Sequence, residues 1–406
     1  MQTPVFKFKA EKRMNSRSLC RPRSCSFDNR SRRSAPYCSL AIATVVCCLL
    51  GAATAGSSQA EEAFRVYAPG SKTQTLWVVD AVPKADGGLD LKLAEKPELG
   101  MRGGVIAAHP KKPLLYISSF GGERGKVPGA VVTLSENGSY VKHQNISFND
   151  DAAYLSLDRS HTFLMGVSYG NGRLNVYRLD ENGVPGKAVA TVDEGKKEAH
   201  CVLASPDNKY LYVPYVKGNL ALLQYGFNAT TGDVTPLEPL DAKPPQGTGP
   251  RHYVFHPALP TVYFTNEQGI GLSTYERRPD GQLVLRQDVP VLPDGMSKQG
   301  LSASDLEITP DGKFIFAGLR GHTQDFDRIV RYRVKSNGEV ELLGLTPTDK
   351  IPWGLALSPG GEYLLVSAST GATLTAYRID AEGGLQKVSS LPWDAEIYDL
   401  VTRKRS

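Results

Sequence analysis

Cysteine is scarce in this 406-residue chain and is almost confined to its first 60 residues. Only Cys201 lies beyond that segment; the other five are Cys20, Cys25, Cys38, Cys47 and Cys48. If the segment is removed, a single cysteine remains and no internal disulfide can form. We therefore expect residues 61–406 to be stabilised by a hydrophobic core alone.

Several other signals are missing. No stretch sustains the 3.6-residue apolar period of an amphipathic helix. The chain has no G-x-S-x-G segment, so it lacks the nucleophile elbow of the α/β-hydrolases. The histidine spacing fits no zinc site, and Asn266 with Glu267 is too little for a calcium site. We predict no metal and no cofactor.

The first 60 residues have the composition of an export leader. Ten Lys or Arg residues lie between Lys7 and Arg33, and the apolar run Ser39–Ala55 follows them. Small residues then precede Glu61, as at a signal cleavage site after Ala55 or Ala60. We expect a periplasmic or secreted domain, residues 61–406, after cleavage. The alternative is a retained leader that tethers the protein to a membrane.

Removing the leader reverses the net charge. The whole chain carries +5, but residues 61–406 hold 37 basic and 40 acidic residues, a balance of −3. The basic surplus thus belongs to the leader. We predict no nucleic-acid partner and, once the leader is gone, no membrane partner.

The remaining chain repeats a unit of about fifty residues. Each unit has an apolar strand, a tight polar turn and a second apolar strand, as in "AHCVLASPDNKYLYVP" from Ala199. A Pro or Arg marks the turn, and we call it the anchor. The anchors are Pro110, Arg159, Pro206, Pro257, Pro310 and Pro359, spaced 47 to 53 residues apart.

Further alternating runs, such as Arg173–Leu179, lie between the anchors. Turn pairs follow them, and these predict two-residue hairpins with positive φ: Asn182-Gly183, Asp280-Gly281, Asn337-Gly338 and Gly383-Gly384. Four short strands in each repeat are typical of a β-propeller blade. Six anchors give six blades, and strands near Phe64 and Leu76 with a C-terminal strand over 395–402 form another. The sequence predicts an all-β, seven-bladed propeller closed by both chain ends.

Two positions break the repeat where the strands approach the channel. Six residues before the anchors stand Gly104, Ala153, His200, Arg251, Ser304 and Trp353. Ten residues after them stand Phe120, Tyr169, Val216, Glu267, Arg320 and Ser369. Four ionisable residues, His200, Arg251, Glu267 and Arg320, thus occupy matched positions in three successive blades. Single charges at strand ends are usually just solvated, but these four converge on one side of the channel.

These four residue types suit acid–base chemistry on an acidic small molecule. Arg251 and Arg320 could bind carboxylate or phosphate oxygens and stabilise a developing oxyanion. His200 and Glu267 are the expected proton-transfer pair. His252 and Asp305, one position further along their strands, are additional candidates for substrate binding, as is Trp353.

Three segments carry a resemblance to a known family: "AHCVLASPDNKYLYVP", "GPRHYVFHP…YFTNE" and "DLEITPDGKFIFAGLR". They resemble the propeller-type lactonases, which include bacterial 6-phosphogluconolactonases and fungal carboxymuconate-lactonizing enzymes. The similarity spans about residues 64–402. In the lactonizing members the proposed active-site His, Glu and two Arg match His200, Glu267, Arg251 and Arg320.

The resemblance implies a metal-independent lactonase acting on an anionic sugar lactone, as a 6-phosphogluconolactonase does. A muconate cycloisomerase, which forms a lactone from a dicarboxylate, is an alternative served by the same residues. Two features count against the phosphogluconate role itself. Many phosphogluconolactonase relatives have "PRG" where this chain has Pro352-Trp353-Gly354, and export would separate the enzyme from cytoplasmic sugar phosphates. A second alternative is a non-catalytic exported propeller that binds a ligand or protein.

Overall fold

The computed structural model describes residues 61–394 and 396–405. The predicted leader, residues 1–60, lies outside the described residues. Within the described part, every regular element is a strand, and no helix is long and apolar enough to cross a membrane.

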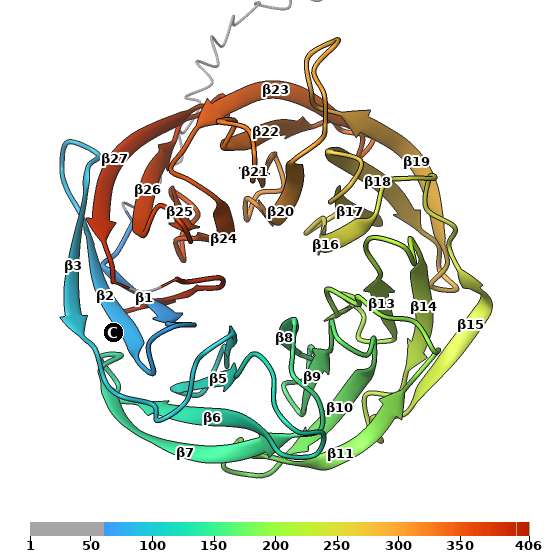
Figure 1. Ribbon diagram of the computed structural model, residues 1–406, viewed down its shortest axis with the longest axis horizontal. Helices are drawn as coiled ribbons and strands as arrows, with labels where there is room; N and C mark the ends of the chain where they lie inside the picture. The colour runs from blue at the N-terminus through green and yellow to red at the C-terminus, as the bar shows by residue number, and fades with distance from the viewer. Residues whose placement is uncertain (1–60, 395, 406) are drawn as a thin grey trace, which may run out of the picture. The chain divides into compact units, whose positions relative to one another are not determined.

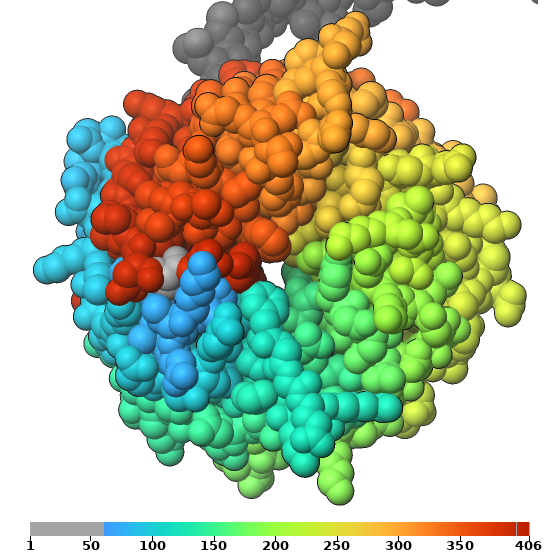
Figure 2. Space-filling view, viewed as in Figure 1, coloured from blue at the N-terminus to red at the C-terminus, as the bar shows by residue number. Residues whose placement is uncertain are grey.

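The strands form seven four-stranded sheets arranged as a ring around a central channel (Figure 1). In each sheet, neighbouring strands pair antiparallel. The strands nearest the channel are β4, β8, β12, β16, β20, β24 and β28. The space-filling view shows the hollow at the centre of the ring (Figure 2). The prediction of a seven-bladed β-propeller is confirmed.

We number the blades from the first one that is continuous in the chain. Blade 1 holds β4 (Val105–Ala108), β5 (Leu114–Ser118), β6 (Val127–Leu134) and β7 (Tyr140–Phe148). Blade 2 holds β8 (Tyr154–Leu157), β9 (Phe163–Val167), β10 (Leu174–Leu179) and β11 (Pro185–Val192). Blade 3 holds β12 (Leu203–Ala204), β13 (Tyr210–Pro214), β14 (Leu222–Phe227) and β15 (Val234–Asp241).

The following blades have the same order from channel to rim. Blade 4 holds β16 (Pro250–Phe255), β17 (Thr261–Asn266), β18 (Gly271–Arg277) and β19 (Leu283–Pro290). Blade 5 holds β20 (Leu301–Ile308), β21 (Phe314–Gly321), β22 (Arg328–Val334) and β23 (Val340–Pro347). Blade 6 holds β24 (Pro352–Leu357), β25 (Tyr363–Ala368), β26 (Thr373–Ile379) and β27 (Leu385–Pro392).

Blade 7 joins the two ends of the described chain. Its strands are β28 (Val401–Lys404), β1 (Phe64–Pro69), β2 (Leu76–Pro83) and β3 (Leu89–Glu95). The closure by both ends is as predicted, but the C-terminal strand is not 395–402. It begins only at Val401, because Ile397 and Leu400 turn into the core between blades 6 and 7 before the ladder starts.

The core is divided among the blade interfaces. Buried apolar residues form seven clusters in the described part, and each cluster lies between two neighbouring blades. The strands second from the channel, such as β17 and β25, are buried along their whole length, since both their faces contact another blade. Outer strands alternate between partly buried and exposed residues. Cys201 is buried and free in the cluster between blades 3 and 4.

The turn pairs form a different hairpin from the one predicted. In the Asp180–Val184 turn, Gly183 N donates to Asp180 O at 2.9 Å and Asp180 N donates to Val184 O at 3.0 Å. Gly183 has φ +84°, but Asn182 is not among the positive-φ residues, so the turn is not a two-residue type I′ turn. The carbonyl of Gly183 accepts the Tyr116 hydroxyl of the preceding blade at 2.8 Å. The glycine thus serves both the turn and the blade interface.

Candidate active site

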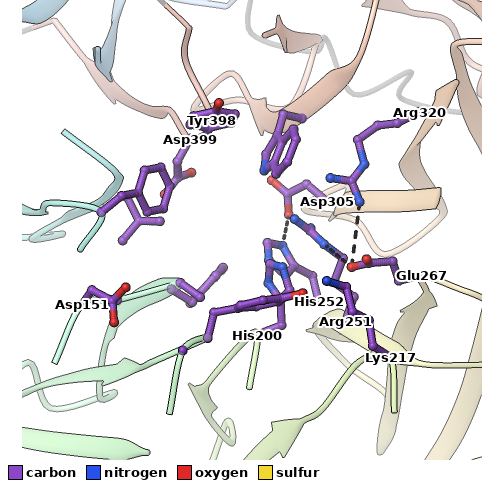
Figure 3. A pocket seen from close by; sticks show the side chains of 18 of the residues that line it. Asp151, His200, Lys217, Arg251, His252, Glu267, Asp305, Arg320, Tyr398 and Asp399 are labelled. Atoms are coloured by element: carbon purple, nitrogen blue, oxygen red, sulfur yellow. Dashed lines mark hydrogen bonds and ion pairs between the residues drawn. The ribbon is translucent and has the colours of Figure 1, made fainter. Parts of the chain in front are cut away.

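A cavity of about 540 Å³ opens into the channel at the end where the inner strands begin (Figure 3). Its volume lies within the range of small-molecule sites. The structure brings together around it all seven residues predicted from sequence. They are His200, Arg251, His252, Glu267, Asp305, Arg320 and Trp353.

β-bulges turn several of these side chains into the cavity. In a regular strand, consecutive residues such as Arg251 and His252 would point to opposite faces. The pairing of β16 with β17 shifts register between Pro250 and Tyr253, and both side chains can then line the cavity. Equivalent shifts flank Asp305 in β20 and Trp353 in β24.

Two buried guanidinium groups share one carboxylate. Arg251 Nε lies 3.1 Å from Glu267 Oε2, and Arg320 Nη2 lies 3.8 Å from the same oxygen. Arg251 and Arg320 are only 1% and 3% exposed. Burial and the neighbouring charge of Arg251 lower the pKa of Arg320 to about 9, so it is still protonated at neutral pH. Together, the two guanidinium groups and the one carboxylate carry a net positive charge.

Some N–H groups of these two guanidinium groups have no partner in the part of the chain that the structure describes. Arg320 Nη2 donates to Ala303 O at 2.8 Å. Within the described residues, Arg251 Nη1 and Arg320 Nε have no hydrogen-bond partner. A buried donor without a partner is costly, so these guanidinium groups are suited to an anion entering the cavity.

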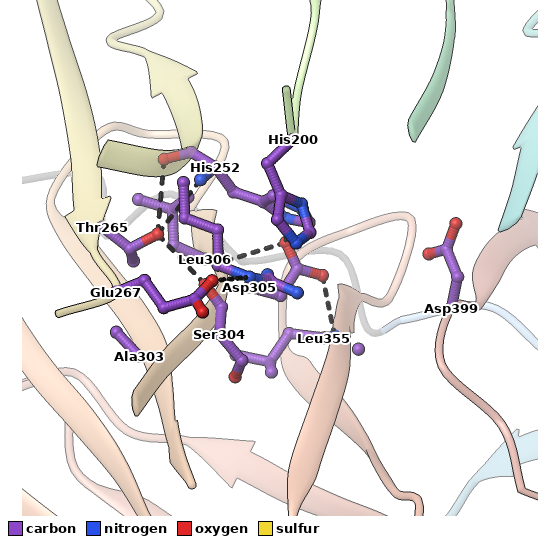
Figure 4. Close-up of polar contacts among 12 residues, drawn as sticks. His200, His252, Thr265, Glu267, Ala303, Ser304, Asp305, Leu306, Leu355 and Asp399 are labelled. Carbon is purple, nitrogen blue, oxygen red and sulfur yellow. Dashed lines mark hydrogen bonds and ion pairs between the residues drawn. The ribbon is translucent and has the colours of Figure 1, made fainter. Parts of the chain in front are cut away.

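A second chain of contacts leads from Asp305 through His252 to His200 (Figure 4). Asp305 Oδ1 lies 2.7 Å from His252 Nδ1, and His252 Nε2 lies 3.1 Å from His200 Nδ1. Because the carboxylate accepts a hydrogen bond, His252 carries its proton on Nδ1 and accepts at Nε2. His200 then donates from Nδ1, which leaves its Nε2 lone pair available.

Both imidazoles are neutral at pH 7. Burial, together with the charge of Arg251, lowers the pKa of His200 well below its ordinary value and that of His252 to about 4. The Thr265 hydroxyl fixes the strand beneath them, because it accepts from His252 N at 3.2 Å and donates to Ser304 O at 3.0 Å. His200 is thus hydrogen-bonded to His252 rather than to Glu267, and Asp305 is linked to it only through His252.

An aromatic wall lies beside the charged groups. Arg320 Cζ lies 4.4 Å from the centre of the Trp353 ring, and the Trp353 and Tyr398 rings are 4.6 Å apart. Phe120 continues the wall, with its ring centre 5.3 Å from that of Tyr398. The cavity thus combines an anion-binding side with a flat apolar side.

Sequence reasoning missed several lining residues, chiefly Lys217, Tyr398 and Asp399. Tyr398 and Asp399 belong to blade 7, whose inner strand β28 is not joined to the next strand of its sheet by a turn, so this blade has no anchor. The signal that the sequence offered was the Asp-Leu pair at 305–306, which recurs at 399–400.

Comparison with known proteins places this geometry in context. Residues 90–393 match the family model described as "Lactonase, 7-bladed beta-propeller". A 6-phosphogluconolactonase of Cronobacter sakazakii is 33% identical over 235 residues, covering 57% of this chain and 68% of the relative. The chain belongs to the seven-bladed propeller lactonase family.

Other members of the lactonase family agree with this assignment. A 6-phosphogluconolactonase of Klebsiella pneumoniae is 30% identical over 254 residues, covering 62% of this chain and 73% of its own. Among solved structures, the periplasmic gluconolactonase of Pseudomonas aeruginosa superposes with a TM-score of 0.72 at 18% identity. That match covers 85% of this chain and 100% of the other, and at this identity it supports the fold.

Proposed function

We propose that the protein is a lactonase that hydrolyses a small anionic lactone in the channel cavity. The observation that carries the proposal is the pair of buried guanidinium groups, Arg251 and Arg320, with unpaired N–H groups beside a neutral imidazole. One side of such a site binds negative charge, and the other can accept a proton. The relatives named 6-phosphogluconolactonase favour a sugar lactone that carries an acidic group.

In the proposed reaction, His200 is the general base. Its Nε2 takes a proton from water, and the water oxygen attacks the lactone carbonyl carbon. Asp305 and His252 position His200 by fixing its tautomer. Arg251 and Arg320 stabilise the negative charge that develops on the carbonyl oxygen, and Glu267 holds the two guanidinium groups in place.

The test is hydrolysis of a lactone panel by the purified protein. The panel contains gluconolactone, 6-phosphogluconolactone and a muconolactone. We expect turnover that EDTA leaves unchanged, since the arginines supply the positive charge. The His200→Ala variant should lose at least a hundredfold in kcat, in line with the usual effect of a general base.

The two alternatives give different results in the same assay. A cycloisomerase would form muconolactone from a muconate faster than it hydrolyses any lactone. A binding propeller would turn over none of the panel while remaining folded. Either result would overturn the lactonase proposal.

We also propose that the protein is exported and that residues 61–406 form the mature domain. The support is the composition of residues 1–60 and the start of the first strand at Phe64. N-terminal sequencing of the protein recovered from a periplasmic or culture fraction should begin after Ala55 or Ala60. An intact N-terminus in a membrane fraction would contradict this proposal.

A further inference from the structure

Asp399 occupies the same structural position in blade 7 as Asp305 does in blade 5. Asp305 Oδ1 accepts from Leu306 N and its Oδ2 from Leu355 N of the next blade, at 2.9 and 3.0 Å. Asp399 repeats both contacts at 2.9 Å, with Leu400 N and with Ile106 N of the next blade. The fold therefore builds one aspartate position twice around the same channel.

The two aspartates differ in their side-chain partners. Asp305 is hydrogen-bonded to His252 of the preceding blade. The matching position in the blade before Asp399 is Gly354, where an added Cβ would lie 3.1 Å from Asp399 Cα and 2.9 Å from Tyr398 O. No side chain of the described residues hydrogen-bonds to the Asp399 carboxyl group, which lines the cavity across from the His252–Asp305 pair (Figure 4).

The surroundings of Asp399 favour the protonated acid. Burial raises its pKa to about 8; the two backbone N–H groups oppose this shift and the charge of Asp305 adds to it. The ionisable groups that face it across the channel are Glu307 of β20, Tyr154 of β8 and Arg251 of β16. At neutral pH Asp399 is therefore an O–H donor opposite the proposed base.

We infer that Asp399 is the general acid that protonates the leaving oxygen of the lactone ring. The inference rests on the proposed lactonase function. Water adds to the carbonyl carbon as His200 takes its proton, and the bond between this carbon and the ring oxygen breaks. Asp399 gives its proton to that oxygen, which becomes the hydroxyl of the product. The proton on His200 then returns to Asp399 through solvent, so the sum is lactone plus water to hydroxy acid.

The position of Asp399 fits an acid that acts separately from the base His200. His200 precedes β12 in blade 3, whereas Asp399 precedes β28 in blade 7, so the two groups approach a bound lactone from different sides of the channel (Figure 3). A base and an acid on different sides can act on the attacking and the leaving oxygen of one carbonyl carbon.

The test compares leaving groups in the full-length protein and its Asp399→Asn variant. The substrates are 6-phosphogluconolactone and a carboxylated dihydrocoumarin. The ring oxygen of the first leaves as an alcohol, and that of the second leaves as a phenol with a pKa of about 10. We expect kcat of the variant to fall at least a hundredfold on the first substrate and less than tenfold on the second. On 6-phosphogluconolactone, wild-type kcat/KM should decline from about pH 8, whereas the residual activity of the variant should decline only from about pH 9, where Arg320 loses its proton.

Glu307→Gln is the matched control. Glu307 is a second channel carboxyl group, half-buried, and loss of solvation raises its pKa well above its ordinary value, but it does not line the cavity. This variant should retain the wild-type alkaline decline. Unchanged 6-phosphogluconolactone turnover and an unchanged pH profile in Asp399→Asn would overturn the inference alone. So would equal losses on both substrates, which indicate a structural role. A folded wild type inert on every lactone would overturn the proposed function itself.

Discussion

Arg320 shows how one side chain links the two halves of the cavity. Its guanidinium group lies 3.8 Å from the Glu267 carboxylate on one side, and its Cζ lies 4.4 Å from the centre of the Trp353 ring on the other. Arginine provides flat, delocalised charge for such a contact, whereas lysine provides a point charge. The shape of the group, and not only its charge, therefore contributes to the site.

The Arg320→Lys variant tests this role. We expect kcat/KM for an anionic lactone to fall about tenfold to a hundredfold, since a hydrogen bond to a charged group contributes about 1.5 to 3 kcal/mol. Arg331→Lys is the control, because Arg331 is half-buried and lies in β22, away from the cavity. Steady-state kinetics should show a loss only in the first variant. Equal losses would point to a general effect on folding.

The histidines also tie stability to pH. The folded-state pKa of His252, about 4, lies below its ordinary value near 6.5. As the pH falls from 6.5 to 4, the unfolded state takes up a proton that folded His252 does not. The free energy of unfolding should therefore decrease over this interval, by on the order of 3 kcal/mol, and His252 should contribute no further decrease below pH 4.

Denaturant titrations of wild type and His252→Gln across this range would measure the effect. The variant should show a flatter dependence on pH, because one of the proton-binding differences has been removed. Parallel profiles for the two proteins would contradict the prediction.

At the scale of elements, the hairpin turns between the outer strands of each blade also support the neighbouring blade. Gly281 has φ +86°, and a Cβ there would come within 2.2 Å of the Tyr210 ring of blade 3. Its carbonyl accepts the Tyr212 hydroxyl of the same neighbouring blade at 2.6 Å. The turn conformation and the blade interface therefore depend on one residue.

Gly281→Ala should lower the free energy of unfolding through both strain and overpacking. Gly295→Ala is the matched control, since Gly295 has φ +78° but nothing within 4 Å of an added Cβ. Strain from positive φ is common to both variants. We expect Gly281→Ala to cost about 1 to 3 kcal/mol more than the control in chemical denaturation. Similar losses would mean that Tyr210 moves aside without cost.

The elements also show what the sequence alone could predict. The anchors repeat because every blade needs the same turn between its inner strands, so the blade count and the positions of Arg251 and Arg320 follow from spacing. The bulge that turns both Arg251 and His252 into the cavity leaves no such pattern. The His252–His200 contact depends on how two blades pack, and local sequence does not specify it. The inner strand of blade 7 has no anchor, because no turn joins β28 to β1, and this hid Tyr398 and Asp399.

At the scale of the whole molecule, the ring depends on a four-residue strand. β28 pairs with β1 from Phe64↔Lys404 to Tyr67↔Val401. Without it, β1 would expose an unpaired edge at the channel. The last strand is thus needed to complete the blade that holds the first.

Deletion of residues 401–406 tests this dependence. We expect the shortened protein to lose cooperative unfolding and to aggregate through the exposed edge of β1. Deletion of residues 405–406 alone is the control, because it leaves β28 intact and removes only terminal contacts such as Arg405 N to Ala63 O. Circular dichroism melts and size-exclusion chromatography of both proteins give the comparison. A cooperative, monodisperse 61–400 protein would contradict the prediction.

The pairing of β1 with β28 also determines when the ring can close during biosynthesis. Tyr67 is among the first described residues to leave the ribosome, but its partner Val401 follows 334 positions later. At a synthesis rate of about 5 to 20 residues per second, roughly 20 to 70 s pass between the synthesis of β1 and that of the strand that completes its sheet. During that interval the nascent ring is open. The protein can therefore become a closed ring only after Val401–Lys404 has been synthesised.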